Sequence, residues 1–339
     1  MDIARWSRLG GVALVVLGLL AVPLRPAVAN HFPCPTDASE CDRPYGDPAL
    51  HQTMDVYYAN PTAPSLRPAV LFIHGGAWIA GDKSNAFQTQ TMDRAPRYLA
   101  DTTGWVAFNM NYRLAGDDVV AGDTKSAYKD QPDDVRAAVL WIKQNADTYS
   151  IDRNRIALVG HSAGGNLALL QAFREDGGPA AVKQVVSWAG PTDMVTLAAY
   201  YACLVSVDHT CGDPKRAFPA TGIRAYEGGC ALLDRPLALE CQNRYLSTSP
   251  VRFVGSNDPP ALLVHGGADI VVPIEQELEL LALHPAKTTL KVCLLAPHVG
   301  ATSVKVTNPV THEEITVVKS KALEDCALNH TIDYLRDNL

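Results

Sequence analysis

The sequence predicts an α/β fold with a mostly parallel central sheet that helices cover on both faces. Two observations favour this fold class. Short apolar runs, as expected for strands buried on both faces, alternate with longer segments of helical periodicity. The chain has 339 residues, 47% of them hydrophobic, which is enough for a large core in one or two domains. A sheet of this kind carries its functional residues at the carboxyl ends of its strands.

Seven segments are predicted to be strands. The most apolar is Ala69-Val70-Leu71-Phe72-Ile73, which suits a central strand, whereas residues 54–58 alternate between apolar and polar side chains. Residues 30–50, rich in Pro, Asp and Cys, are expected to form an N-terminal arm that one disulfide pins. The complete set of predicted strands is 54–58, 69–73, 105–110, 156–159, 184–188, 261–265 and 288–295.

Helices are predicted between these strands. The clearest begins at Asp133 and places Val135, Val139, Ile142 and Ala146 on one face. The first helix contains Pro96, which we expect to bend or divide it. Residues 195–250 break the alternation of strands and helices. The predicted helices are 87–100, 133–146, 166–173, 274–283 and 328–339.

The first 29 residues are predicted to be a signal peptide. A basic start is followed by the apolar run 11–22 and by the cleavage signal Ala27-Val28-Ala29. We therefore expect residues 30–339 to form a single domain, secreted or periplasmic, with no stable membrane insertion after cleavage. The alternative is an uncleaved membrane anchor, but the apolar run is short for a span and Pro23 ends it.

Charge and cysteine content narrow the class of protein. The formal net charge is -7 and no basic block stands out, which argues against a nucleic-acid partner. Eight cysteines in an exported chain predict disulfides, and the lack of a Cys-x-x-Cys pair in the sequence argues against a zinc site. Buried free thiols are the alternative. The pairs we expect join sequence neighbours: Cys34–Cys41, Cys203–Cys211, Cys230–Cys241 and Cys293–Cys326.

A candidate nucleophile lies in Gly160-His161-Ser162-Ala163-Gly164. The predicted strand 156–159 precedes this segment and the helical pattern 166–173 follows it, the context that a Gly-x-Ser-x-Gly nucleophile elbow requires. Glycines at both flanks remove side chains that would clash in so tight a turn, and Ser162 is expected to have strained backbone angles at a helix N-terminus. The alternative is a glycine-rich turn of another α/β protein.

The candidate acid is Asp269. It follows the predicted strand 261–265 within His265-Gly266-Gly267-Ala268-Asp269, a segment that we interpret as a turn. A carboxylate at a strand end could orient a catalytic histidine. Glu275 and Asp258 are weaker candidates, since one lies inside a predicted helix and the other lies beside two prolines.

The candidate base is His298, just after the last central strand and 29 residues beyond Asp269 (298 − 269). The chain order Ser162, Asp269, His298 is one of the known orders of a Ser-His-Asp triad. His284, His312 and His330 compete for this role.

These motifs resemble the α/β-hydrolase superfamily, and more narrowly the esterases grouped near hormone-sensitive lipase and the bacterial carboxylesterases. The resemblance is carried by His74-Gly75-Gly76-Ala77-Trp78, by the elbow, and by Asn111-Tyr112-Arg113, Gly190-Pro191-Thr192-Asp193 and Ser249-Pro250, and it covers about residues 50–339. The chain departs from the family at Val299, where Gly usually follows the catalytic histidine, and in the additional polar, β-prone residues 301–319.

The resemblance implies acyl transfer to Ser162, with backbone N–H groups of Gly75, Gly76 and Ala163 forming the oxyanion hole and His74 structural. Trp78 and His161, from the same motifs, are candidate substrate-binding residues. Residues 195–250 lie where this superfamily inserts a cap. The substrate would be a small-molecule ester, and the mechanism needs no metal or cofactor. An amidase or peptidase with the same triad and a non-catalytic binding module are the alternatives, and the natural ester and the oligomeric state stay open.

Overall fold

A computed structural model describes most of the chain after the predicted signal peptide. The signal peptide, Cys34 and Cys211 lie outside the described residues, and so does the side chain of Cys203. No helix within the described part is long and apolar enough to cross a membrane. The described residues are 35–60, 63–84, 90–115, 127–175, 177–206, 214–230, 239–293, 296–298, 304–307, 314–317 and 322–339.

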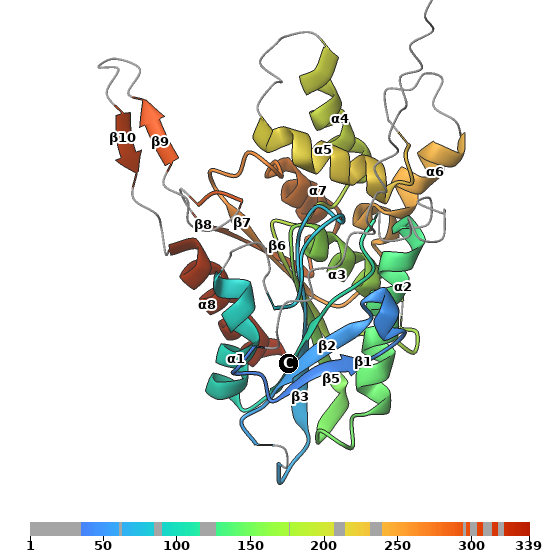
Figure 1. The fold of residues 1–339 in the computed structure, drawn as a ribbon, viewed down its shortest axis with the longest axis vertical. Helices are drawn as coiled ribbons and strands as arrows, with labels where there is room; N and C mark the ends of the chain where they lie inside the picture. Colours follow the sequence, from blue (N-terminus) through green and yellow to red (C-terminus); the bar gives the residue numbers. More distant parts are fainter. Residues whose placement is uncertain are drawn as a thin grey trace, which may run out of the picture. The chain divides into compact units, whose positions relative to one another are not determined.

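An eight-stranded sheet lies at the centre, in the order β1-β2-β4-β3-β5-β6-β7-β8 (Figure 1). The six strands from β4 to β8 in this order are parallel to one another, and β2 is antiparallel to both of its neighbours. The predicted mostly parallel sheet is therefore confirmed. The strands are β1 (Glu40–Pro44), β2 (Thr53–Tyr57), β3 (Arg67–Ile73), β4 (Val106–Met110), β5 (Ile151–His161), β6 (Gln184–Trp188), β7 (Ala261–Gly266) and β8 (Thr288–Cys293).

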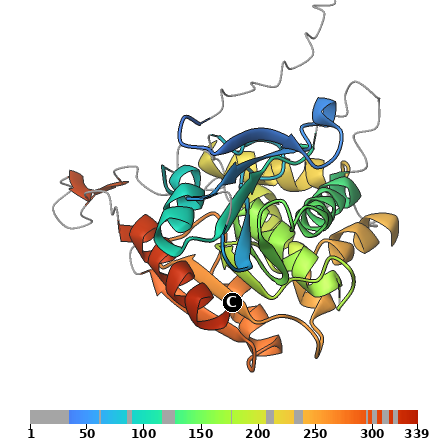
Figure 2. The same ribbon diagram turned by 90° about the horizontal axis from the view of Figure 1, so that it is seen from below.

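Helices cover both faces of the sheet (Figure 2). Alternate side chains of β3 point to opposite faces. Val70 and Phe72 pack with α1 (Gln90–Thr103) and α8 (Ala322–Asn338). Leu71 and Ile73 belong to the larger cluster, which includes α2 (Ala127–Gln144), α3 (Ala163–Arg174) and α7 (Glu275–Leu283). Burial on both faces explains why the central strands are continuous apolar runs.

A helical insertion separates β6 from β7, where the sequence predicted a cap. Its helices are α4 (Met194–Ser206), α5 (Pro214–Tyr226) and α6 (Leu239–Ser247), and the short helix η4 (Pro250–Phe253) follows them. The predicted disulfide Cys230–Cys241 is present within the insertion. The disulfide Cys293–Cys326, also as predicted, joins β8 to α8. Cys41 is disulfide-bonded as well, whereas the pair Cys203–Cys211 stays a prediction.

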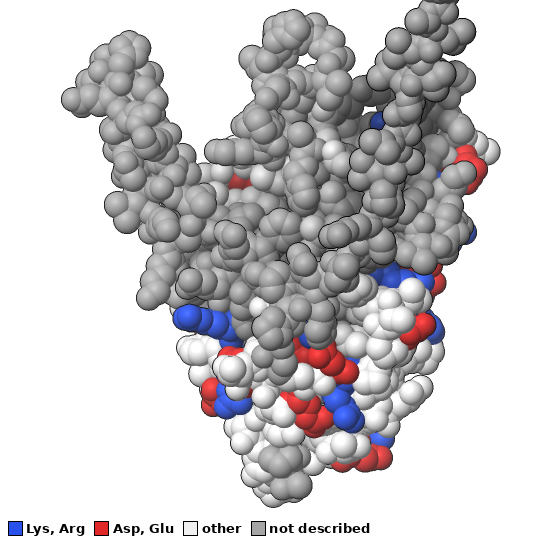
Figure 3. Space-filling view, in the orientation of Figure 1, with Lys and Arg blue, Asp and Glu red and all other residues white. Residues whose placement is uncertain are grey.

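Two further short elements lie outside the main sheet. β9 (Val304–Thr307) and β10 (Glu314–Val317) form an antiparallel pair between β8 and α8, in agreement with the β-prone segment seen in the sequence. A short helix, η1 (Pro48–Leu50), precedes β2. On the face shown in Figure 3, the described acidic and basic side chains lie interspersed.

The predicted N-terminal arm contains a strand that the sequence did not predict, β1, which lies at one edge of the sheet. Its polar sequence lacks the alternation that marks a strand, and its pairing with β2 is irregular between Glu40 and Arg43. The buried ammonium of Lys83 forms ion pairs with Asp42 of β1 (2.9 Å) and with Asp55 of β2 (3.0 Å). Tertiary charge pairing therefore holds a strand that local propensity does not predict.

Three helices also differ from expectation, and one of them, α8, begins at Ala322, six residues before the predicted start at 328 (328 − 322). Helix α1 is not divided by Pro96. Helix α2 begins at Ala127, six residues before the predicted start, and contains Pro132. The additional turn is held by tertiary contacts, since Gln131 donates a hydrogen bond to the Trp78 carbonyl and Asp130 forms an ion pair with Arg113. Such long-range contacts outweigh the local cost of proline.

Candidate active site

Ser162 stands at a tight turn between β5 and α3. Its backbone angles, φ 54° and ψ −122°, are strained for a residue with a side chain. A Cβ atom at Gly160 would lie 2.1 Å from the Gly164 carbonyl oxygen, and one at Gly164 would lie 2.2 Å from the Ile73 carbonyl oxygen. Only glycine therefore fits at the positions two residues before and two residues after Ser162.

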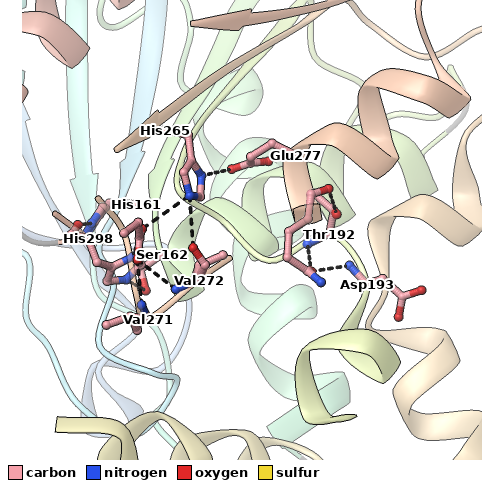
Figure 4. A network of polar contacts seen from close by, with 11 residues as sticks. His161, Ser162, Thr192, Asp193, His265, Val271, Val272, Glu277 and His298 are labelled. Carbon is pink, nitrogen blue, oxygen red and sulfur yellow. Dashed lines mark hydrogen bonds and ion pairs between the residues drawn. The ribbon is translucent and has the colours of Figure 1, made fainter. Parts of the chain in front are cut away.

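The structure brings Ser162, His298 and Asp269 together from the ends of β5, β8 and β7. The Ser162 hydroxyl lies 2.8 Å from His298 Nε2, and His298 Nδ1 lies 2.7 Å from Asp269 Oδ2. Ser162 and His298 are labelled side by side in Figure 4. They are 136 residues apart in sequence, so only the parallel topology places them in contact.

Asp269 is held as a buried carboxylate. Burial alone would raise its pKa, but the charge and hydrogen bond of His298, the nearby His265 and the Val272 N–H lower it. Its Oδ1 accepts hydrogen bonds from the backbone N–H groups of Val271 (2.8 Å) and Val272 (2.9 Å). An ionised Oδ2 can only accept, so His298 Nδ1 carries the proton and Nε2 is left to accept the Ser162 proton.

The competing acids and bases lie elsewhere. Asp258 is buried and accepts a hydrogen bond from the Gly255 N–H, and Glu275 is exposed on α7. His284 packs edge-on against Phe173 and hydrogen-bonds Thr288. His330 is part of α8, and His312 lies outside the described residues.

His161, predicted to bind substrate, contacts the backbone of the base. Its Nε2 donates a hydrogen bond to the His298 carbonyl at 3.0 Å, and the two rings lie 5.2 Å apart. Burial, followed by the charge of His298, lowers the pKa of His161 to about 4. His161 is therefore neutral near pH 7, and it ties the segment that carries His298 to the end of β5.

The backbone of Gly75 lies directly against the nucleophile. A Cβ atom there would lie 3.0 Å from Ser162 Cβ and 2.9 Å from the His161 carbonyl oxygen, so a glycine lets the chain approach this closely. The next residue, Gly76, has φ 126°, a conformation that favours glycine. His74 is buried, donates to the Gly75 carbonyl (2.7 Å) and stacks on Tyr112, which fits a structural role.

Trp78, the other predicted substrate-binding residue, lies in the core, with only 3% of its surface exposed. Its ring stacks on Tyr226 of α5, with centroids 4.8 Å apart and planes 8° apart. Its carbonyl accepts a hydrogen bond from Gln131 of α2. The structure thus places Trp78 at the contact between residues 74–78 and the insertion.

Sequence reasoning missed a buried histidine next to Asp269, with Nε2 3.6 Å from Asp269 Oδ2. His265, interpreted as part of a turn, is the fifth residue of β7, and both of its ring nitrogens contact oxygen atoms (Figure 4). Nδ1 lies 3.2 Å from Glu277 and Nε2 lies 3.1 Å from the Val272 carbonyl, which can only accept. Its place at the end of a buried strand, next to the candidate acid, was the available signal. Among the described residues, no group of side chains has the composition of a metal site.

Comparisons with known proteins show the family to which the chain belongs. The sequence model of the BD-FAE family matches residues 54–283, more than half of the chain. The chain belongs to the BD-FAE family. Ser162, Gly75 and Asp269 lie inside the BD-FAE match, whereas His298 lies 15 residues beyond its end (298 − 283).

Two curated relatives of this BD-FAE chain come from Mycobacterium tuberculosis. Esterase LipC is 30% identical over 248 residues, which are 68% of this chain and 51% of LipC. Carboxylesterase NlhH is 32% identical over 211 residues, 60% of each chain. The chain thus spans about half the length of LipC and less than two thirds of NlhH.

A solved structure shows the fold independently. It is described as a truncated form of carbohydrate esterase from gut microbiota, and it has a TM-score of 0.62 at 18% identity, with 90% of this chain and 98% of that chain covered. With the BD-FAE match and the two relatives, this likeness confirms the predicted α/β-hydrolase fold. The predicted resemblance to esterases near hormone-sensitive lipase and the bacterial carboxylesterases is confirmed as well.

Proposed function

We propose that this protein is a serine hydrolase of carboxylic esters with small to medium acyl groups. The observation that carries the proposal is the chain of hydrogen bonds from Asp269 through His298 to Ser162, at a strained elbow against Gly75. A serine hydroxyl is a weak nucleophile by itself and needs a neutral base within hydrogen-bond reach. The relatives' names, esterase and carboxylesterase, support an ester as the substrate.

The mechanism follows from the positions of the protons. As Ser162 Oγ attacks the ester carbonyl, its proton passes to His298 Nε2, and the imidazolium is stabilised by the Asp269 carboxylate. Backbone N–H groups of Gly75, Gly76 and Ala163 stabilise the negative charge on the carbonyl oxygen. Collapse of this intermediate releases the alcohol, which takes the proton from His298.

The second half of the reaction repeats these proton transfers, with water in place of Ser162 as the nucleophile. Water attacks the acyl-enzyme and transfers a proton to His298 Nε2. The proton then returns to Ser162 Oγ as the acid leaves. One base therefore serves both steps, and the reaction consumes only ester and water.

A series of p-nitrophenyl esters from acetate to palmitate tests the proposal. We expect activity that is highest at short chains and that falls by about 10³-fold or more in Ser162→Ala and in His298→Ala. Retention of activity in Ser162→Ala would exclude the mechanism. Acetylated sugars belong in the same series, because one structure of this fold is described as a carbohydrate esterase. The matched anilide tests the amidase alternative, and labelling of Ser162 by a fluorophosphonate argues against a non-catalytic binding module.

We also propose that the protein acts outside the cytoplasm as a mature chain of residues 30–339. The support is the pair of disulfides Cys230–Cys241 and Cys293–Cys326, which form and persist in oxidising compartments. When the full chain is expressed, active protein should be found outside the cytoplasm, with Asn30 as its N-terminus. An intact N-terminus in the membrane fraction would favour an anchor instead.

A further inference from the structure

The acid loop, residues 269–272 between β7 and α7, is held by side chains at three successive carbonyl groups. The Tyr200 hydroxyl donates to the Ile270 carbonyl (3.1 Å), and the Tyr201 hydroxyl donates to the Val271 carbonyl (2.5 Å). His265 Nε2 contacts the third carbonyl, that of Val272. Both tyrosines belong to α4, the first helix of the insertion, and are 70 residues from the loop in sequence.

The two tyrosines contact the same peptide groups that hold the candidate acid. The peptide between Ile270 and Val271 accepts from Tyr200 at its carbonyl and donates to Asp269 Oδ1 through its N–H. The peptide between Val271 and Val272 does the same for Tyr201. A peptide group is planar, so a hydroxyl bound at one end orients the N–H at the other, and each bond polarises the next.

Helix α4 is itself tied to the elements around the acid loop. The backbone N–H groups of Thr192 and Asp193, just before α4, both donate to the side-chain carbonyl of Gln276 in α7. Thr192 and Asp193 are labelled in Figure 4. At the first residue of α4, the Met194 N–H donates to Ser249 Oγ. The segment before α4 is therefore bound to α7, which begins three residues after the acid loop (275 − 272), and α4 itself is bound to the loop through Tyr200 and Tyr201.

We propose that Tyr200 and Tyr201 are positioning residues for Asp269, so that the insertion takes part in setting the reactivity of the Ser162–His298 pair. This inference rests on the proposed function. It makes α4 a fixed part of the catalytic apparatus. Loss of either hydroxyl should loosen one of the two N–H groups that orient Oδ1, and thereby the bond between Oδ2 and His298.

The test compares Tyr201→Phe, Tyr200→Phe and the double variant with Tyr245→Phe in the full chain. Tyr245 is a matched control, because its hydroxyl also donates to a carbonyl within the insertion, that of Cys230 (3.0 Å). For each protein, kcat and KM for p-nitrophenyl acetate are measured across pH, together with the low-field proton NMR signal of the bond between His298 Nδ1 and Asp269.

We expect kcat to fall by about tenfold in each single variant on the acid loop, with KM within about twofold. The acid limb of kcat/KM should move to lower pH, because a loosely held carboxylate stabilises the imidazolium less. The low-field signal should weaken or exchange faster in these variants and stay unchanged in Tyr245→Phe.

Equal kcat, pH profile and NMR signal in Tyr201→Phe and Tyr245→Phe would overturn the inference. If Tyr201→Phe fails to fold, Tyr200→Phe gives the same comparison through the neighbouring peptide. Failure of the proposed function has a different signature, since the wild-type protein would then lack both ester hydrolysis and fluorophosphonate labelling. The NMR comparison would still report whether the tyrosines order Asp269.

Discussion

Replacing Asp269 with Asn should abolish the proposed ester hydrolysis by selecting the wrong tautomer of His298. Oδ1 of Asp269 accepts two backbone N–H groups, at 2.8 and 2.9 Å. In the variant, the amide oxygen must occupy this position, because an NH2 group there would face two donors. The opposite orientation would forfeit two buried hydrogen bonds, at about 1–3 kcal/mol each. The Asn NH2 group therefore faces His298 Nδ1.

An NH2 group can only donate, so His298 must accept at Nδ1 and carry its proton on Nε2. Nε2 can then no longer take the proton of Ser162. We expect kcat for p-nitrophenyl acetate to fall by about 10³–10⁴-fold. Asp269→Ala is the informative control, because it lets His298 adopt either tautomer. It should retain more activity than Asp269→Asn, although it removes more of the side chain.

The relative activities of the two variants test the tautomer argument. Equal or greater activity in Asp269→Asn than in Asp269→Ala would refute the tautomer argument. Thermal unfolding of both proteins provides the necessary check that the fold is intact. Nitrogen NMR of the imidazole ring reports the tautomer directly and should show Nε2 protonated in Asp269→Asn.

Three further predictions concern stability. Gly164→Ala should destabilise the fold by about 3 kcal/mol or more in a denaturant unfolding assay, since its Cβ would lie 2.2 Å from a backbone oxygen. The control Gly104→Ala should lower the free energy of unfolding by only about 1 kcal/mol, because Gly104 has φ +73° but open space around the added Cβ. Burial raises the pKa of Glu227 from 4.5 to about 8, so the native state keeps a proton that the unfolded chain loses, and the free energy of unfolding falls as pH rises from about 4.5 to 8. Glu227→Gln should remove this loss and be more stable than wild type by about 4 kcal/mol at pH 8 but not at pH 4, and a parallel pH dependence in both proteins would contradict the assignment. Loss of the disulfide Cys293–Cys326, which spans 33 residues, should lower the free energy of unfolding by about 4 kcal/mol. Loss of Cys230–Cys241, which spans 11 residues, should lower it by about 3 kcal/mol. A larger loss of thermal stability in the Ser variants of Cys230–Cys241 would count against loop closure as the cause.

Local sequence accounts for the parts of the site that depend on local sterics. The strand, the glycine-flanked Ser162 and the following helix could be predicted because the clashes at Gly160 and Gly164 arise within one turn and against the neighbouring strand end. Chain order singled out Asp269 and His298 from several rivals, because both follow parallel strands, β7 and β8, whose carboxyl ends meet at one end of the sheet. Periodicity likewise predicted the central strands and most of the helices.

The tertiary structure alone decided which residues support that site. Lys83 holds the polar edge strand β1 from 41 residues away (83 − 42), and Tyr200 and Tyr201 contact the acid loop from 70 residues away. No periodicity marks them, because their energy comes from partners that local sequence does not contain. The sequence by itself thus determined the fold class and the order of the candidate triad, where sterics and strand ends are local. Only the folded chain decided what holds the candidate acid and base in place, since hydrogen bonds between distant segments exist only once those segments meet.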